Sequence, residues 1–312
     1  MISEIQSDVE KIEADTSIYE YADFNARTNA IDFIDFHIID RIDGLIQKAG
    51  QNDELTKLKI YANGLKAKLE NINTEMFLDL EKQINISKNK GFVFRGIIAN
   101  FLNNFQHNEE EHDAIGYDNL DILINGLLST NTIDKPIKKL EPEMVFYQKT
   151  PARVVVELSK KIDENDIFFD IGSGIGQVVI LVNLISSARV IGIEFEPSFC
   201  NYAKVQVSKL NLDNIEIIND DARMADYSSG TVFFLYTPFV GKIMQDLLAL
   251  LKKISLQKVI RIFTYGPCSL TISQQNWLKC INGNADNINK LYEFKSFSTK
   301  DFHIQGLQLG QK

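Results

Sequence analysis

The chain has 312 residues, of which 45% are hydrophobic, and it carries a formal net charge of −9 with a pI near 5.1. This length allows two domains, or one large domain with an extension. The acidic balance argues against tight, nonspecific binding of nucleic acid through a broad basic face, although a local basic patch stays open.

Cysteine and histidine usage points away from disulfides and metals. Cys200, Cys268 and Cys280 form no C-x-x-C pair, and the four histidines are scattered without metal-ligand spacing. The first residues lack the basic and apolar regions of a secretory signal, and no apolar run is long enough to span a membrane. We therefore expect a cytoplasmic protein with free thiols, no metal site and no membrane span.

The first 140 residues show apolar stripes at helical spacing. One stripe contains Ile31, Ile34, Ile38, Ile42 and Leu45, and a second contains Leu55, Leu58, Leu65, Leu69, Ile72 and Met76. A turn over residues 49–53 separates them, so an antiparallel helical hairpin is predicted. Asn63-Gly64 marks a kink or a break in the second helix.

Two more helices follow, and together these elements predict an all-α N-terminal domain over residues 1–140. The third apolar face consists of Phe94, Ile97, Ile98, Phe101 and Phe105, and residues 119–128 form a short helix. None of these faces carries chemistry. A coiled-coil dimer through the N-terminal helices is the weaker alternative, because the heptad pattern lasts only about three repeats.

From residue 141 onward, apolar strands alternate with helices, which predicts an α/β domain over 141–312. Strands are predicted at 167–171, 190–194, 215–218, 232–236 and 259–264, and helices at 153–160, 176–187, 198–210 and 242–252. Residues 291–294 and 302–307 are candidates for two further strands. Such repeats form a parallel sheet with right-handed crossovers, and ligands bind outside the carboxyl ends of its strands.

The first strand of this domain runs into a glycine turn and a helix. Gly172, Gly174 and Gly176 allow the backbone to approach a ligand, and the helix N-terminus points its unpaired N–H groups at the turn. A dinucleotide fingerprint would need a third glycine at position 177, which is Gln177. The pattern D-x-G-x-G-x-G, which starts at Asp170, instead resembles the motif of class I S-adenosylmethionine (SAM) methyltransferases.

Carboxylates follow the next two strands. Glu194 ends the second strand, where an acidic residue can accept hydrogen bonds from ribose hydroxyls, or can simply face water. Asp221 and Ala222 follow the third strand, where class I methyltransferases place an acidic contact to the adenine amino group. Asp220 is the competing choice, and a plain turn is the alternative interpretation.

Two further segments complete the candidate site. Tyr147 and Thr150 could fold back over the cofactor, although a helix start with Pro151 in its first turn explains the segment equally well.

Residues 236–239 read Tyr-Thr-Pro-Phe. Enzymes that methylate amino groups of nucleic acid carry Asn/Asp-Pro-Pro-Tyr/Phe at this place, so this chain lacks their amide or carboxylate. We expect Tyr236, Thr237 and Phe239 to contact the methyl acceptor.

Together, Tyr147-x-x-Thr150, residues 169–179 and residues 192–194 resemble the core of the disruptor-of-telomeric-silencing (Dot-type) family of histone lysine methyltransferases. The resemblance covers residues 145–240. It implies a Rossmann-like class I methyltransferase fold with a seven-stranded sheet, SAM as cofactor and S-adenosylhomocysteine as product. The implied cofactor-binding residues are Tyr147, Thr150, Asp170, Gly172, Gln177, Glu194 and Asp221, with Ser173, Gly174, Gly176 and Ala222 in the same turns.

The methyl acceptor stays open at this point. A protein side chain, with lysine as the residue that the resemblance implies, competes with a small molecule or RNA, and a noncatalytic scaffold is a third alternative. Tyr236, Phe239 and Tyr265 could wall an apolar channel that favours a neutral amine by desolvation. No residue stands out as a general base.

Overall fold

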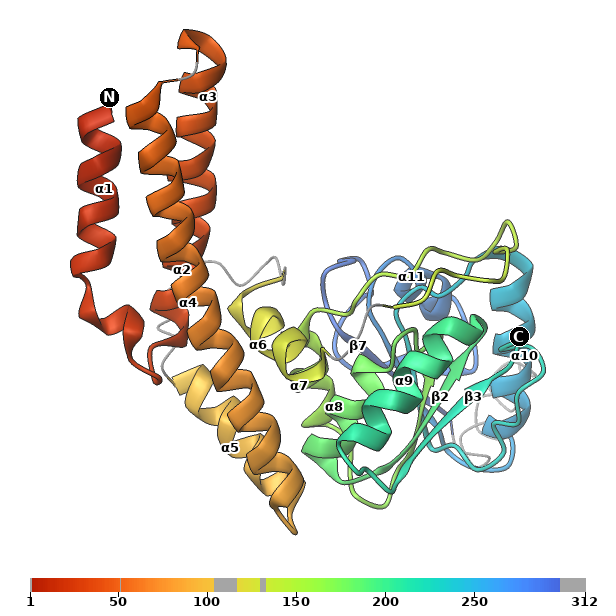
Figure 1. Cartoon of the computed structure of the whole chain (residues 1–312). Coiled ribbons are helices and arrows are strands. Elements are labelled where there is room, and N and C mark those ends of the chain that lie inside the picture. The colour runs from red at the N-terminus through yellow and green to blue at the C-terminus, as the bar shows by residue number, and fades with distance from the viewer. Residues whose placement is uncertain (1, 51, 104–116, 130–132, 298–312) are drawn as a thin grey trace. The chain divides into compact units, whose positions relative to one another are not determined.

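The computed structural model describes residues 2–50, 52–103, 117–129 and 133–297 (Figure 1). The chain divides into two compact units. A helical unit contains residues 1–83 and 122–127, and a sheet unit contains residues 84–121 and 128–312. These units are compact parts of the structure. That residues 1–140 and 141–312 form separate domains remains a prediction.

The helical unit is built around the two predicted stripes. Its elements are α1 (Ile2–Ala14), the 3-10 helix η1 (Thr16–Tyr19), α2 (Phe24–Phe33), the π-helix η2 (Ile34–Ile39), α3 (Asp40–Ala49) and α4 (Asp53–Ile86). Its core cluster draws on both stripes and on the unpredicted α1, through Ile5, Val9, Ile34, Ile38, Ile42, Leu55, Leu65 and Leu69. The chain reverses between α3 and α4, as a hairpin requires (Figure 1). Asn63-Gly64 lies inside α4, which continues through it without a break.

The sheet unit has a seven-stranded sheet in the order β3-β2-β1-β4-β5-β7-β6. The strands are β1 (Ile167–Ile171), β2 (Arg189–Glu194), β3 (Ile215–Asn219), β4 (Val232–Leu235), β5 (Arg261–Thr264), β6 (Leu278–Cys280) and β7 (Tyr292–Ser296). Strands β1 to β5 pair in parallel, whereas β7 lies antiparallel between β5 and β6. The predicted class I methyltransferase fold with a seven-stranded sheet is confirmed.

The seventh strand comes from a different segment than expected. The predicted strand at 302–307 lies outside the described residues, while β7 occupies the place predicted for 291–294. The additional strand is β6, which has only three residues. A segment this short cannot show a strand periodicity, so sequence reasoning missed it.

Helices cover both faces of the sheet. The helices that pack on strands include α8 (Gln177–Ser186), α9 (Pro197–Lys209), α10 (Gly241–Ser255) and α11 (Cys268–Ser273). Helices α5 (Lys90–Asn103) and α7 (Ala152–Ser159) pack on α8, and α6 (Asn119–Leu128) is divided between the two units. On one face, Phe169 and Phe233 share a core cluster with Leu247 of α10 and Ile272 of α11.

Helix α8 packs on the other face, against β2, α7 and α5. Its residues from Gln177 to Val182 are all buried, which explains why a β-branched run forms a helix here. The last apolar residue of the third predicted stripe, Phe105, lies outside the described residues, and α5 contains the other four.

Candidate active site

A pocket of about 810 Å³ opens at the carboxyl ends of β1, β2 and β4, within the sheet unit. Residues 136–150, which we call the strap, form part of its wall. An antiparallel bridge joins Met144 to Phe239, and the Val145 N–H donates to the Pro238 carbonyl at 3.1 Å. The predicted residues that line the pocket are Tyr147, Thr150, Asp170, Gly172, Ser173, Gln177, Glu194, Asp221, Ala222, Tyr236, Thr237 and Phe239.

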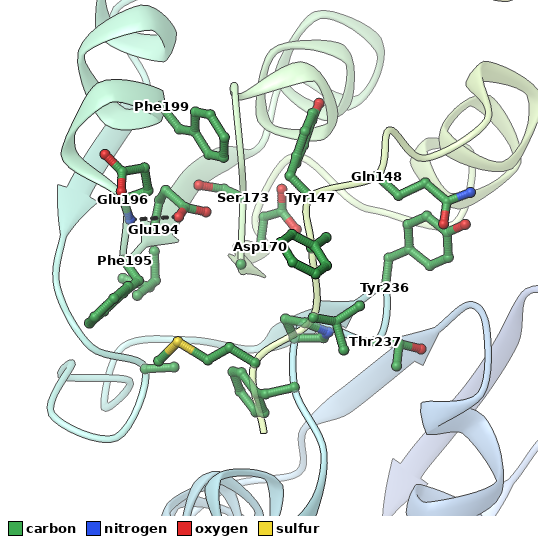
Figure 2. A pocket seen from close by; sticks show the side chains of 18 of the residues that line it. Tyr147, Gln148, Asp170, Ser173, Glu194, Phe195, Glu196, Phe199, Tyr236 and Thr237 are labelled. Carbon is green, nitrogen blue, oxygen red and sulfur yellow. Dashed lines mark hydrogen bonds between the residues drawn. The ribbon is translucent and has the colours of Figure 1, made fainter. Parts of the chain in front are cut away.

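The pocket has two distinguishable ends. Figure 2 shows Glu194, Phe195, Glu196 and Phe199 on one side, and Gln148, Tyr236 and Thr237 on the other. Asp170, Ser173 and Tyr147 lie between these groups. We call the first side the cofactor end and the second side the acceptor end.

The glycine turn needs glycine for both conformation and space. Gly172, Gly174 and Gly176 have φ values of +81°, +52° and +83°, which side chains rarely adopt. A Cβ on Gly174 would lie 2.1 Å from the Tyr147 ring, and one on Gly172 would lie 2.5 Å from Cβ of Pro238. Of the three, Gly172 lines the pocket, Gly174 packs against the Tyr147 ring, and Gly176 is the N-cap of α8.

Glu194 ties the turn to the end of β2. One carboxylate oxygen accepts the Gly174 N–H and the other accepts the Glu196 N–H, both at 2.7 Å. Burial raises the pKa of Glu194, and the hydrogen bonds from backbone N–H groups oppose that rise. Each oxygen of a carboxylate can accept more than one hydrogen bond, so Glu194 can hold the turn and still receive ligand hydroxyls.

Three buried polar atoms of residues that line the pocket have no hydrogen-bond partner in the described part of the chain. They are Oδ2 of Asp170, Oγ of Ser173 and Oε1 of Gln177. Burial, and then the nearby Glu194, raise the pKa of Asp170 to about 8. Because unsatisfied buried groups are costly and rare, three of them among the residues that line one pocket indicate a polar ligand.

These residues fit SAM. Asp170 can accept hydrogen bonds from the ammonium group of its methionine part, and Ser173 and Gln177 offer further polar contacts beside it. Glu194 can accept hydrogen bonds from the ribose hydroxyls. The individual contacts with the cofactor stay predictions.

Sequence reasoning missed several residues at the cofactor end. Phe195 and Phe199 line the pocket, and Phe199 packs on Tyr147 with ring centroids 5.3 Å apart. Lys138 of the strap places its ammonium 3.9 Å from the centroid of Phe195. Phe195 directly follows Glu194, the predicted ribose carboxylate, and this position could have predicted that Phe195 lines the cofactor site.

Glu196 anchors the strap at this end. Its carboxylate accepts the backbone N–H groups of Ile137 and Lys138 at 2.9 and 2.8 Å. Burial alone would raise the pKa of Glu196, but the hydrogen bonds from N–H groups and from Ser198 outweigh it and lower the pKa to about 2. The strap is therefore held by a permanently charged carboxylate.

Asp221 lines the pocket but is already paired. Nε and Nη2 of Arg223 donate to its two oxygens at 2.9 and 2.5 Å, and Arg223 also pairs with Glu141 of the strap at 2.6 Å. The side-chain hydrogen bonds from Arg223 lower the pKa of Asp221. Asp221 thus connects the loop after β3 to the strap, and its predicted contact with adenine stays a prediction.

At the acceptor end, Tyr236 and Tyr265 follow β4 and β5 with ring centroids 5.0 Å apart. Burial raises the pKa of Tyr236 to about 12. Thr237 adopts φ = +40°, which is unusual for a β-branched residue. Its hydroxyl accepts the Cys268 N–H at 3.1 Å and donates to the Tyr265 carbonyl at 3.4 Å. Thr237 therefore links the two loops that present the tyrosines.

Phe239 has two kinds of surroundings. It is 5% exposed and belongs to the core cluster that contains α10, yet it also lines the pocket. Its predicted contact with an acceptor stays a prediction. Among the described residues no cluster could hold a metal ion, and no described helix is long and apolar enough to span a membrane.

Residues 147–217 match the family model described as histone methylation protein DOT1. The predicted resemblance to the Dot-type family is confirmed over this segment, which contains the glycine turn and Glu194.

Curated relatives match short parts of the chain. A ribosomal protein L11 methyltransferase of Clostridium perfringens is 29% identical over 90 residues, which is 28% of this chain and 29% of the relative. A probable ribosomal RNA small subunit methyltransferase A of Methanosphaera stadtmanae is 38% identical over 66 residues, which is 21% of this chain and 24% of the relative. The chain thus matches less than a third of the length of either relative.

Among solved structures, an RNA methyltransferase from Salinibacter ruber in complex with S-adenosyl-L-homocysteine is 23% identical to this chain. The alignment covers 48% of this chain and 92% of that chain with a TM-score of 0.37. A TM-score this low adds nothing to the fold assignment, which rests on the strand order.

Proposed function

We propose that the chain is a SAM-dependent methyltransferase that acts on an amine of a protein side chain, with lysine as the favoured residue. One observation carries the proposal. Asp170, Ser173 and Gln177 line one pocket, and each has a buried polar atom without a partner among the described residues, next to a glycine turn that Glu194 holds at the end of β2. The DOT1 match over residues 147–217 supports the same activity.

When bound, SAM supplies a methyl group on a sulfonium: an in-line nucleophile bonds to the methyl carbon as the carbon–sulfur bond breaks, and S-adenosylhomocysteine leaves with that electron pair. The residues of this chain have to orient the cofactor and exclude water. Asp170 and Glu194 provide fixed hydrogen-bond acceptors. Tyr147, which packs on Phe199 and over Gly174, covers the turn from the strap side.

The aromatic acceptor end supports an amine as nucleophile. A free lysine amine has a pKa of about 10.4 and must lose a proton before it can attack. The ring faces of Tyr236 and Tyr265 attract an ammonium or a sulfonium, and a dry channel favours the neutral amine. A protein acceptor is also consistent with the match to a ribosomal protein L11 methyltransferase. The name of that relative describes its own substrate and does not identify the substrate of this chain.

Methyl transfer from labelled SAM into a cell lysate tests the proposal. We expect label in protein that protease releases and nuclease leaves intact, and a Gly174→Val variant should transfer none. Label that nuclease removes would replace the protein acceptor with RNA. Label in low-molecular-weight material would indicate a small-molecule acceptor. Tight binding of SAM without any transfer would indicate a noncatalytic scaffold.

We further propose a reducing, cytoplasmic setting, because Cys200, Cys268 and Cys280 are all free thiols and two of them are buried. Dimerisation through the N-terminal helices stays a weaker prediction. Sedimentation of the purified chain at micromolar concentration measures its oligomeric state.

A further inference from the structure

The acceptor end lacks a side-chain amide or carboxylate at the end of β4, because Tyr236 occupies that position. Aromatic rings can surround a nitrogen nucleophile, but they do not direct its lone pair. An acceptor nitrogen that carries N–H groups needs a hydrogen-bond acceptor to orient it toward the methyl group. The pocket offers such a group from another segment of the chain.

We propose that the side-chain oxygen of Gln148 accepts a hydrogen bond from the acceptor nitrogen and orients it. This inference rests on the proposed methyltransferase function. Gln148 is exposed and lines the pocket, and its carboxamide makes no hydrogen bond within the described residues. Figure 2 shows its side chain on the same side of the pocket as Tyr236, away from Glu194 and Glu196.

The backbone around Gln148 is fixed on both sides, which gives its side chain a defined origin. Upstream, Val145 donates to the Pro238 carbonyl next to the bridge between Met144 and Phe239. Downstream, Nε2 of Gln177 donates to the Thr150 carbonyl at 3.3 Å. The carboxamide therefore projects from a segment that is anchored to the loop after β4 and to the first turn of α8.

Two other polar side chains near this end are already committed. The Thr237 hydroxyl bonds to the Cys268 N–H and the Tyr265 carbonyl, and the Glu143 carboxylate accepts the Ile243 N–H at 2.9 Å at the start of α10. Asn289 is the competing carboxamide, since it also lines the pocket. We favour Gln148 because Figure 2 shows it on the same side of the pocket as Tyr236, and because the strap that carries it is hydrogen-bonded to the loop after β4.

A carboxamide does not titrate, so Gln148 orients the acceptor without removing its proton. An amide can also donate through its NH2 group, which would suit an anionic acceptor. The neighbouring ring faces of Tyr236 and Tyr265 disfavour an anion and favour an amine. The acceptor class at this subsite is therefore an amine that enters with at least one N–H.

Two bisubstrate probes test this subsite without knowledge of the natural acceptor. In both, nitrogen replaces the sulfur of S-adenosylhomocysteine. The first probe carries a 2-aminoethyl arm on that nitrogen and the second an n-propyl arm. Calorimetry on the wild-type chain should show about tenfold tighter binding of the amine arm, the value of one hydrogen bond that involves a charged group. In Gln148→Leu the preference should fall to about twofold.

The controls separate this inference from the proposed function. Asn289→Leu should keep the amine preference, and so should Glu216→Gln, which changes an exposed residue of β3 outside the pocket. S-adenosylhomocysteine itself should bind all four proteins equally. A full amine preference in Gln148→Leu, or its loss in Asn289→Leu, would overturn the assignment of Gln148 while leaving the cofactor site intact. Tighter binding of a probe with a carboxymethyl arm would overturn the amine class. If the wild-type chain does not bind S-adenosylhomocysteine, the proposed function fails first.

Discussion

The two ends of the pocket are built in different ways. At the cofactor end, Gly174, Glu194 and Glu196 form a short network of backbone and carboxylate hydrogen bonds between two adjacent strands. At the acceptor end, Gln148, Tyr236 and Tyr265 come from three segments far apart in the sequence, and Thr237 connects two of them. The network that holds the glycine turn is therefore local to two strands, whereas the acceptor end depends on how three segments distant in sequence pack.

The largest expected effect on stability comes from the close contact between Gly172 in the glycine turn and Pro238 in the loop after β4. In Gly172→Ala, the new Cβ would approach Cβ of Pro238 to 2.5 Å in a backbone with φ = +81°. Overpacking and the left-handed conformation together should lower the free energy of unfolding by about 2–4 kcal/mol. Urea unfolding measures the loss, and binding of S-adenosylhomocysteine should be abolished at micromolar concentration.

Gly64→Ala is the matched control. Gly64 lies in the interior of α4, with no atom within 4 Å of the position of a new Cβ. This substitution should stabilise the chain by about 0.5–1 kcal/mol, because alanine favours the helix. If Gly172→Ala were as stable as wild type, the turn and the loop after β4 would not be in tight contact.

The second effect is confined to the cofactor end. Glu194→Gln retains the shape of the side chain but turns an NH2 group toward the N–H of Gly174 or Glu196. It also removes the charge that we expect ribose hydroxyls to contact. The affinity for S-adenosylhomocysteine should fall about 10- to 100-fold.

Glu216→Gln provides the comparison for Glu194→Gln. Glu216 is an exposed residue of β3 that pairs with Arg189 at 3.4 Å and does not line the pocket. Its loss should leave cofactor affinity unchanged, because exposed ion pairs contribute little. Equal affinities for wild type and Glu194→Gln would remove Glu194 from the ribose site.

The third effect is a pH dependence that arises at the centre of the pocket. The pKa of Asp170 is about 8 in the ligand-free fold and about 3.9 in an unfolded chain. Between these values the folded state binds a proton that the unfolded state has lost, so stability falls as pH rises. The slope is at most about 1.4 kcal/mol per pH unit, and it ends above about pH 8.

Urea unfolding of the ligand-free chain from pH 5 to 9 should show this slope, and Asp170→Asn should remove it. Asp226→Asn is the control. Hydrogen bonds from Ser228 lower the pKa of Asp226, so its contribution to the free energy of unfolding no longer changes with pH above about pH 5. A slope that persists in Asp170→Asn would assign the titration to another group, with Glu194 as the first alternative.

The difference between the two ends also explains what sequence could predict. Strand β1, its glycine turn and α8 are consecutive, so their apolar run and glycine spacing predict both the fold and the place of the cofactor. Glu194 follows from the same logic, because it ends the adjacent strand. These features depend on local order, which a sequence displays directly.

Features that depend on tertiary packing were not predictable in the same way. The pairing of Arg223 with both Asp221 and Glu141 joins segments that are 82 positions apart. The hydroxyl bonds of Thr237 depend on how the loop after β5 folds back. The three-residue β6 forms only because β7 offers it a partner. In each case the residue type was visible, but its partner was not.

The smallest expected effect concerns Asp221, which connects the loop after β3 to the strap through Arg223. Its carboxylate is partly exposed and already accepts two side-chain hydrogen bonds from Arg223. Oδ2 retains a lone pair that could accept the adenine amino group. Asp221→Asn keeps the size of the side chain and should weaken S-adenosylhomocysteine binding by only about three- to fivefold, since the contact is shared and exposed to solvent.

A matched ligand separates an adenine contact from a purely structural role. S-inosylhomocysteine carries a carbonyl where adenosine carries the amino group, so a residue that accepts from that amino group should distinguish the two ligands. Wild type should prefer the adenosine form, and Asp221→Asn should lose about threefold of that preference. Arg223→Met, which breaks the link to Glu141 but leaves the carboxylate, should keep the preference while it weakens both ligands equally. An unchanged preference in Asp221→Asn would leave Asp221 as a link between the β3 loop and the strap, and the purine would then be recognised by packing against Phe195.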